Sequence, residues 1–510
     1  MDRRKFLRQL GLITGAGSIS MTLGNVPVRA FSKSIFKTTK NNGKVLVLVQ
    51  LSGGNDGLNT VVPFEDDLYY KFRPNIAIPK SDVHRVNTLT GLHPSMDGFK
   101  QLYDEGKLSI VQNVGYENQN RSHFRSTDIW LSASDSDEYI SDGWIGRYLG
   151  YSVMNDPEFN PDHPMAIQLG SAQSTLLECT CQSGSLGIAF EDPNRFFQLI
   201  NGSSADNDPP PDTLAGHQLK FIKEIEARSI RYAELIKEKA DTVENKVNYP
   251  NSNLAEQLSI VAQLVGGGLE TPVYLTSMGG FDTHSNQLSR HASLLSRLSE
   301  AITAFQRDLE ALGVADRVVI MTFSEFGRTV EQNGSMGTDH GAAAPLFVIG
   351  KNVNGGVFGD NPDLTDLDNS GDNKYHYDFR SVYASILRDH LGADPDDMNQ
   401  KILLKKFDTL PLISVKSIAA GGPKTFDIQQ NYPNPFNPVT TIRYTLRIPQ
   451  IISLKVYDVR GREVETLFQG YKDAGNYTAK FGGRRYPSGI YFCHLVSGSY
   501  RKTIKMTLAK

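Results

Sequence analysis

The sequence predicts an α/β fold, with a mostly parallel sheet sandwiched by helices, followed by a small C-terminal antiparallel β-sandwich. Continuous apolar runs, such as KVLVLVQL at residues 44–51, are typical of strands that are buried on both faces of a parallel sheet. Helical patterns lie between these runs, and strands that alternate with helices favour a sheet covered by helices. From residue 426 the apolar runs become short and alternating, which indicates antiparallel strands.

Five strands and four helices are expected before residue 415. The expected strands are 44–51, 108–114, 272–276, 317–323 and 345–349. The expected helices are 97–105, 213–247, 254–265 and 287–312. In the last of these, Leu294, Leu298 and Ile302 recur at helical spacing. Because sites in such sheets form where strands end, the strand ends are the places to look for chemistry.

Short strands are expected in the C-terminal region at 440–446, 452–458, 477–481, 489–496 and 500–508. Three motifs accompany them: NYPNPFNP at 431–438, VYDVRG at 456–461 and SGIY at 488–491. Together they resemble the C-terminal sorting domain of type IX secretion substrates, rather than a generic carbohydrate-binding or immunoglobulin-like tail. The resemblance implies that residues 426–510 direct the protein across the outer membrane through the type IX machinery.

Residues 1–30 have the features of an export signal. A charged start, which includes Arg3 and Arg4, precedes a short apolar run at 10–23 that is too short to span a membrane. The arginine pair resembles a twin-arginine signal, with an ordinary secretory signal as the alternative. We therefore expect a signal peptide at 1–30, a body at 31–415, twin-arginine machinery as a partner, and transit through the periplasm to the cell surface or the medium.

Charge and cysteine content exclude some classes of protein. The net charge is −3, but residues 1–30 and 423–510 are both basic, so the body is strongly acidic. This charge argues against nucleic acid as a partner, because binding phosphates requires clustered Lys and Arg. Cys179 and Cys181 are too close for a relaxed disulfide. No partner Cys or His lies close in sequence, so buried thiols are expected rather than a soft-metal site.

An acidic loop lies between residues 360 and 372. Asp366, Asp368 and Asp372 have part of the rhythm of a calcium loop, but no Glu stands at the position of the bidentate ligand. The pattern favours a solvated loop over a calcium site.

Polar clusters follow the predicted strands of the body. They are Asn55-Asp56-Gly57, Arg121-Ser122-His123, Asp282-Thr283-His284, Ser324-Glu325 and Asp339-His340. Asp, Glu and His that recur at strand ends predict a divalent metal site, for zinc, calcium or magnesium. The i, i+2 spacing of Asp282 and His284 puts both side chains on one face of an extended segment. As alternatives, Asp56 shapes a turn and Ser122 caps a helix.

Several motifs in order resemble the family catalogued as domain of unknown function 1501. They are LSGGNDGLNTVVPF (51–64), RPNIAI (73–78), GLHPSM (91–96), NRSHF (120–124), GGFDTHSNQ (279–287), SEFGRT (324–329) and GTDHGAAAP (337–345). That family is similar in fold to the alkaline phosphatase and sulfatase superfamily. The resemblance implies Ser122 as nucleophile with Arg121 and His123 as further catalytic residues, and metal ligands at Asp56, Asp282, His284, Glu325, Asp339 and His340.

These implications give two hypotheses about function. The first is an exported metal-dependent hydrolase of phosphate or sulfate esters. The second is a non-catalytic binding protein at the cell surface. The second stays open because the superfamily usually separates its Asp and His by three residues, whereas one residue separates Asp282 from His284. Glu325-Phe326 also replaces an Asp-His pair of the superfamily, which argues against a second metal.

Overall fold

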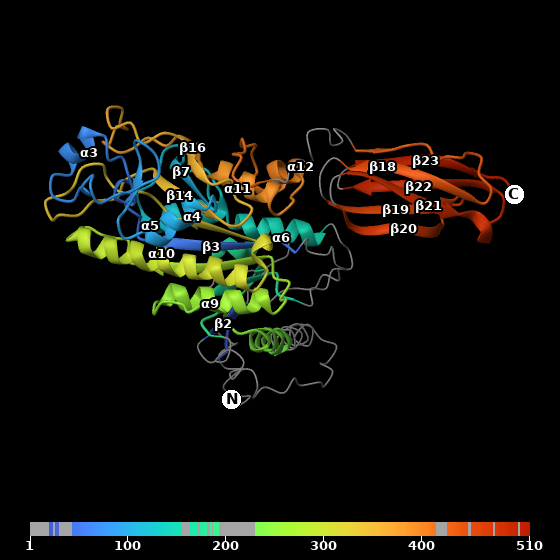
Figure 1. The fold of residues 1–510 in the computed structure, drawn as a ribbon, viewed down its shortest axis with the longest axis horizontal. Coiled ribbons are helices and arrows are strands. Elements are labelled where there is room, and N and C mark those ends of the chain that lie inside the picture. The colour runs from blue at the N-terminus through green and yellow to red at the C-terminus, as the bar shows by residue number, and fades with distance from the viewer. Residues whose placement is uncertain are drawn as a thin grey trace, which may run out of the picture. The chain divides into compact units, whose positions relative to one another are not determined.

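A computed structural model describes residues 20–23, 26–29, 43–154, 163–170, 174–180, 184–185, 187–192, 230–414, 426–446, 450–472, 475–497 and 500–510. The chain divides into two compact units (Figure 1). One unit contains residues 43–386 and 398–413, which we call the body. The other contains residues 387–397 and 414 together with residues 426–510, and we call residues 426–510 the tail. Each unit is described by itself.

Nine described strands form one mixed sheet in the body. In spatial order they are β11 (Gly187–Phe190), β8 (Ala166–Leu169), β12 (Val273–Gly279), β3 (Val45–Ser52), β13 (Val318–Phe323), β14 (Ala344–Ile349), β7 (Leu108–Gly115) and β15 (Gly356–Phe358), with β16 (Tyr377–Asp378) also on β7. Neighbouring strands are parallel except at β14, which is antiparallel to both β13 and β7. This confirms the prediction of a mostly parallel sheet.

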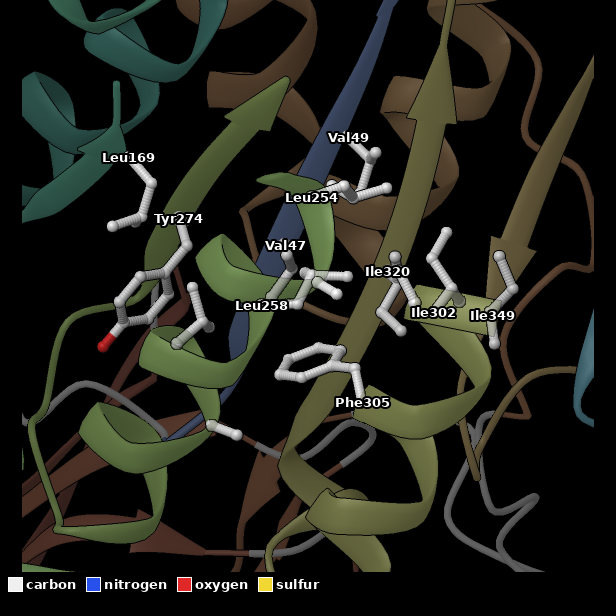
Figure 2. Close-up of a cluster of buried hydrophobic side chains, with 14 of the residues drawn as sticks. Val47, Val49, Leu169, Leu254, Leu258, Tyr274, Ile302, Phe305, Ile320 and Ile349 are labelled. Atoms are coloured by element: carbon white, nitrogen blue, oxygen red, sulfur yellow. The ribbon is translucent and has the colours of Figure 1, made fainter. Parts of the chain in front are cut away.

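One face of this sheet is covered by helices α9 (Asn253–Gly266) and α10 (Gln287–Ala311), and α4 (Asp97–Asp104) packs against α10. Figure 2 shows apolar side chains of α9 and α10 lying over the central strands. Leu258 and Phe305 belong to the same buried cluster as Val47 and Ile320. The alternation of strand side chains puts these core residues on one face.

Aromatic residues cover the opposite face. Trp130, in α5 (His123–Ser132), stacks on Phe323 of β13 with ring centroids 6.0 Å apart. Trp144, at the start of α6 (Trp144–Met154), stacks on Tyr383 of α11 (Phe379–Asp389) at 4.2 Å. Helices on both faces confirm the predicted α/β sandwich.

The tail consists of two antiparallel sheets around one core. The three-stranded sheet contains β17 (Asp427–Ile428), β18 (Val439–Leu446) and β21 (Gly475–Gly482); the four-stranded sheet contains β20 (Glu463–Lys472), β19 (Gln450–Asp458), β22 (Gly489–Ser497) and β23 (Tyr500–Leu508). Ile442 of the first sheet and Leu454 of the second belong to the same buried cluster. The predicted small β-sandwich is thus confirmed.

Some expectations were incomplete. Strands β8, β11 and β20 were not predicted, and of the helix expected at 213–247 only 230–242 is described as helical. The arginine pair of the expected signal peptide lies outside the described residues.

The remaining short elements of the body include α2 (Gly57–Thr60), α3 (Asp67–Phe72), β4 (Val61–Val62), β5 (His84–Arg85) and β6 (Gly91–Leu92).

The sequence predicts neither a membrane-spanning segment nor a disulfide. Within the described part of the chain, no helix combines the length and the apolar character needed to cross a membrane. The expectation of a buried thiol at Cys179 is wrong, because Cys179 is disulfide-bonded. Cys493 is a free, buried cysteine.

Candidate metal centre

The candidate site lies at one edge of the main sheet, where several strand ends meet. Strands β12, β3, β13 and β7 run in the same direction, so the loops that follow them leave from the same edge. The antiparallel strand β14 begins at this edge, and the segment before it carries Asp339 and His340. The topology therefore brings together residues that are far apart in the sequence.

Two segments, 282–284 and 338–340, lie side by side. The backbone N–H of Thr338 donates to the carbonyl of Thr283 at 3.2 Å. A Cβ added to Gly337 would lie 2.3 Å from the carbonyl carbon of His284, so only glycine allows this close approach. Thr283 is fully buried, whereas Asp282 and His284 on either side of it are partly exposed, as the i, i+2 spacing predicts.

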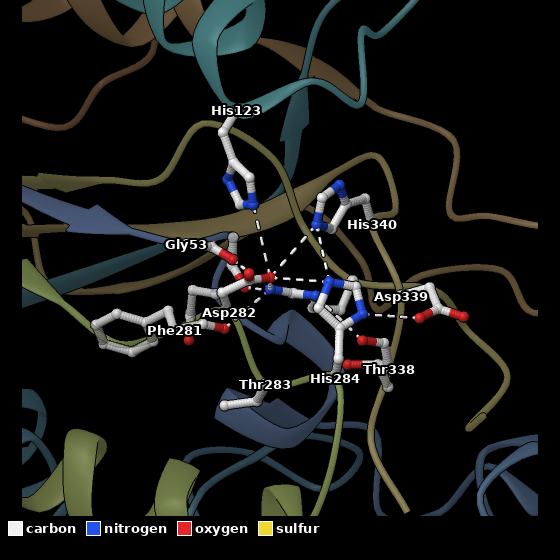
Figure 3. A network of polar contacts seen from close by, with 12 residues as sticks. Gly53, His123, Phe281, Asp282, Thr283, His284, Thr338, Asp339 and His340 are labelled. Carbon is white, nitrogen blue, oxygen red and sulfur yellow. Dashed lines mark hydrogen bonds and ion pairs between the residues drawn. The ribbon is translucent and has the colours of Figure 1, made fainter. Parts of the chain in front are cut away.

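Three imidazoles converge on one carboxylate oxygen, as Figure 3 shows. Asp282 Oδ1 lies 3.0 Å from His284 Nε2, 3.3 Å from His340 Nε2 and 3.5 Å from His123 Nε2. The Nε2 atoms of His284 and His340 are themselves only 3.0 Å apart. Ligand atoms of His123, Asp282 and His340 all lie within 4.8 Å of one another, close enough to hold one metal ion.

The other ring nitrogen of each histidine faces an acceptor. His123 Nδ1 lies 2.7 Å from Glu325 Oε1, His284 Nδ1 lies 2.8 Å from Asp339 Oδ1, and His340 Nδ1 lies 2.8 Å from the carbonyl oxygen of Arg121. A neutral imidazole carries one proton, and these acceptors place it on Nδ1. The Nε2 lone pairs then face one another and a carboxylate, and a cation between them would relieve the repulsion. Histidine ligands of metals are oriented in this way.

The side chain of Arg328 forms an ion pair with Asp282. Its guanidinium is fully buried, donates to Asp282 Oδ1, and also donates to the carbonyls of Gly54 at 2.8 Å and Thr338 at 3.0 Å. Partial burial raises the pKa of Asp282, but the hydrogen bond and charge of Arg328 outweigh it and hold that pKa below its usual value. The hydrogen bond from His284 likewise lowers the pKa of Asp339. Both carboxylates are therefore ionised near neutral pH.

Asp56 is not brought to this cluster. Its side chain is completely buried and accepts hydrogen bonds from Arg73 at 2.7 Å and from Gln287. Desolvation raises the pKa of Asp56, but the charge and hydrogen bond of Arg73 lower it further, so the net shift is downward. This arrangement does not agree with the predicted ligand role of Asp56, because its carboxylate is paired with the buried guanidinium of Arg73.

Glu325 and Asp339 reach the cluster only through histidines. Glu325 is buried, and its Oε1 accepts from the backbone N–H of Gly53 at 2.8 Å besides contacting His123. Asp339 is half-exposed and also accepts from Asn333 at 3.2 Å. Both were expected to be ligands, and in the structure each contacts the Nδ1 atom of a histidine of the cluster.

The three residues expected to be catalytic lie at the start of α5. Ser122 is the N-cap of α5, is exposed, and makes no capping hydrogen bond with its side chain. His123 contributes its imidazole to the cluster. Arg121 does not point a free guanidinium at the site, because it contacts Asp372 at 2.5 Å and Asp368 at 2.9 Å. The acidic loop thus binds the side chain of Arg121. From the sequence it was expected to be a solvated loop, with a calcium site as the alternative.

Some residues of the site were not assigned a role from sequence. Arg328 pairs with Asp282, and Gln287 accepts hydrogen bonds from Thr283 and Thr338, one in each of the two segments. Both stand inside the recognised motifs, SEFGRT and GGFDTHSNQ, which was the available signal. His123 was expected to be a catalytic residue, and in the structure its Nε2 lies 3.5 Å from Asp282 Oδ1 in the cluster.

Comparisons with solved structures return proteins of low sequence identity. A protein in the alkaline phosphatase superfamily from Vibrio parahaemolyticus is 10% identical, with 91% of this chain and 90% of that chain covered and a TM-score of 0.34. The PsFucS1 sulfatase from Pseudoalteromonas sp. is 10% identical, with 87% and 84% covered and a TM-score of 0.32. Latent PorU from Porphyromonas gingivalis is 18% identical, but the match spans only 17% of this chain and 9% of that one, at a TM-score of 0.14.

Family comparisons match two segments of the chain. No curated protein matches it. Residues 239–405 match the family described as "Protein of unknown function (DUF1501)", and this segment contains the GGFDTHSNQ, SEFGRT and GTDHG motifs. Residues 430–509 match "Secretion system C-terminal sorting domain", which implies export to the cell surface or the medium. The segment that matches the DUF1501 model therefore contains Asp282, His284 and His340 of the candidate metal centre, and a segment that matches a secretion sorting domain follows it.

Proposed function

We propose that this protein is an exported, zinc-dependent hydrolase of phosphate or sulfate esters. The observation that carries the proposal is the convergence of three histidine Nε2 atoms on Asp282 Oδ1. The side chains of Asp282 and His284 are 47% and 44% exposed, so a metal ion or a substrate can reach the cluster from solvent. The proposed ligands are therefore His123, Asp282, His284 and His340.

The donor set favours zinc among the three metals considered. Calcium and magnesium prefer oxygen ligands, whereas three imidazole nitrogens with one carboxylate oxygen suit zinc. The acceptors at the Nδ1 atoms support this choice, because they fix the tautomer in which Nε2 is free to bind a metal. A bound zinc ion would polarise an ester oxygen and favour deprotonation of a nearby hydroxyl.

Ser122 is the proposed nucleophile. It is covalently joined to Arg121, whose carbonyl orients His340, and to His123, a proposed ligand. Its hydroxyl is not used to cap α5. The first turn of a helix also favours anions, which suits a negatively charged ester group next to Ser122. In the proposed step the Ser122 oxygen bonds to phosphorus or sulfur, the bond to the ester oxygen breaks, and the hydroxyl proton leaves with the alcohol product.

The test combines metal content with hydrolysis by the full-length protein. Wild type should contain about one zinc ion per chain and cleave chromogenic phosphate or sulfate esters. His340→Ala should lose zinc and activity together, because a ligand is removed. Ser122→Ala should keep zinc and lose at least a hundredfold in activity, on the order expected for a nucleophile. Full activity of Ser122→Ala would exclude Ser122 as nucleophile, and a wild type that binds no zinc would sink the proposal.

A specific observation favours a second candidate, a non-catalytic binding protein. Arg121 and Arg125 flank Ser122 in the sequence, but neither guanidinium is free to hold an oxyanion: Arg121 pairs with Asp368 and Asp372, and Arg125 pairs with Asp128. If the protein contains zinc but hydrolyses none of the esters, the binding function is the better description. The same zinc measurement therefore serves both candidates, and the hydrolysis assay separates them.

A further inference from the structure

A buried chain of hydrogen bonds lies beneath the proposed zinc site. The hydroxyls of Thr283 and Thr338 contact Gln287 Oε1 at 3.0 and 2.6 Å. Gln287 Nε2 donates to Asp56 Oδ2. All four residues are fully buried. The chain continues to Arg73, whose Nη1 is 2.7 Å from Asp56 Oδ2.

The chemistry of these groups fixes the direction of each hydrogen bond. A carboxylate only accepts, so the amide nitrogen of Gln287 must face Asp56. The amide oxygen of Gln287 then faces the two threonines, and both hydroxyls must donate to it. Arg73 holds the far end of the chain, because it also donates to the carbonyls of Val330 at 2.9 Å and Thr329 at 2.8 Å. A single amide oxygen is therefore shared by two segments, 282–284 and 338–340.

We infer that Gln287 is a positioning residue that fixes the spacing of these two segments and thereby sets the affinity for zinc. The inference rests on the zinc site of the proposed function. Thr283 stands between Asp282 and His284, and Thr338 stands two residues before His340. A shift of either threonine therefore moves at least one of these proposed ligands. The remaining direct backbone tie between the segments is the 3.2 Å hydrogen bond from Thr338 to Thr283.

The test removes one hydroxyl at a time from the full-length protein. Thr283→Val and Thr338→Val keep nearly the same shape, and each leaves Gln287 Oε1 with one donor. Each should weaken zinc binding about tenfold, the lower end of the effect of residues that orient metal ligands. The matched control is Thr276→Val, a fully buried threonine of β12 whose hydroxyl lies 3.2 Å from the carbonyl oxygen of Leu48. Zinc dissociation constants come from competition with a chromogenic chelator.

Two further measurements separate the possible results. Unfolding in EDTA, followed by tryptophan fluorescence, shows whether the variants fold without zinc. If a valine variant does not fold, Thr283→Ser and Thr338→Ser replace it; they retain the donor and should keep wild-type affinity, and a tenfold loss in them would overturn the inference. Valine variants that bind zinc as tightly as Thr276→Val would also overturn it, while the zinc site itself would stand. A wild type that binds no zinc would instead refute the proposed function.

Discussion

At the scale of single residues, the kinds of side chain at the site were predictable, but their roles were not. Glu325 and Asp339 were expected to bind the metal, and each instead contacts the Nδ1 atom of a histidine. Asp56 was expected to be a ligand and is buried against Arg73. A carboxylate that binds a metal and a carboxylate that orients a histidine ligand are both acidic side chains near strand ends. Only distances of about 3 Å distinguish the two roles, and sequence does not contain them.

Two buried histidines should make the stability of the body depend on pH. Burial is the main cause that lowers the pKa of His291 to about 4 and that of His93 to about 3. Both are neutral in the folded protein, whereas the unfolded chain takes up these protons below about pH 6.5. Their contribution to stability is therefore full above about pH 6.5 and decreases as the pH falls towards 4, by roughly 3 kcal/mol for His291 alone.

Urea unfolding in EDTA between pH 7 and pH 4 tests this expectation without a contribution from metal release. The two tryptophans of the chain, Trp130 and Trp144, both lie in the body, so their fluorescence reports on the body alone. His291→Gln should show a shallower loss of unfolding free energy with falling pH than wild type. Equal pH slopes for the two proteins would refute the assignment.

At the scale of elements, the buried strands could be predicted, but their order and direction could not. The runs around β3 and β13 are apolar throughout because both faces of these strands are buried. An apolar run reads the same in either direction, so the reversal of β14 was not foreseen. This reversal matters for the site, because it puts the start of β14, and with it the segment containing His340, at the edge where the parallel strands end. The short strands β8 and β11, four residues each, offered too little pattern to recognise.

The close approach of the two segments that carry proposed ligands, 282–284 and 338–340, gives a prediction at this scale. Gly337→Ala should push segment 338–340 away from His284, because the new Cβ would lie 2.3 Å from the carbonyl carbon of that residue. We expect a loss of about 1–3 kcal/mol in stability, typical of overpacking, together with weaker zinc binding. The matched control is Gly334→Ala in the same loop, where an added Cβ meets nothing within 4 Å. Thermal unfolding and zinc titration measure the two effects; identical behaviour of the two variants would show that the close approach is not needed.

At the scale of the whole molecule, the chain combines a body that contains the candidate site with a tail that matches a secretion sorting domain. Each unit has its own buried core: that of the body includes Val47 and Phe305, and that of the tail includes Ile442 and Leu454. The sorting domain was predictable because its motifs are local and specific, and the match at 430–509 confirms it. The twin-arginine signal and passage through the periplasm stay predictions, since Arg3 and Arg4 lie outside the described residues.

Separate cores predict that the tail can be removed without loss of the body. A variant lacking residues 423–510 should unfold in urea at the same midpoint as wild type when followed by the fluorescence of Trp130 and Trp144, because no tryptophan and no core residue of the body is deleted. In cells the same variant should be absent from the surface and the medium, because the sorting domain is the signal for that export. Fractionation followed by immunoblotting measures its location. A lowered urea midpoint would mean that the tail stabilises the body. Delivery to the surface without the tail would mean that residues 423–510 are not the export signal.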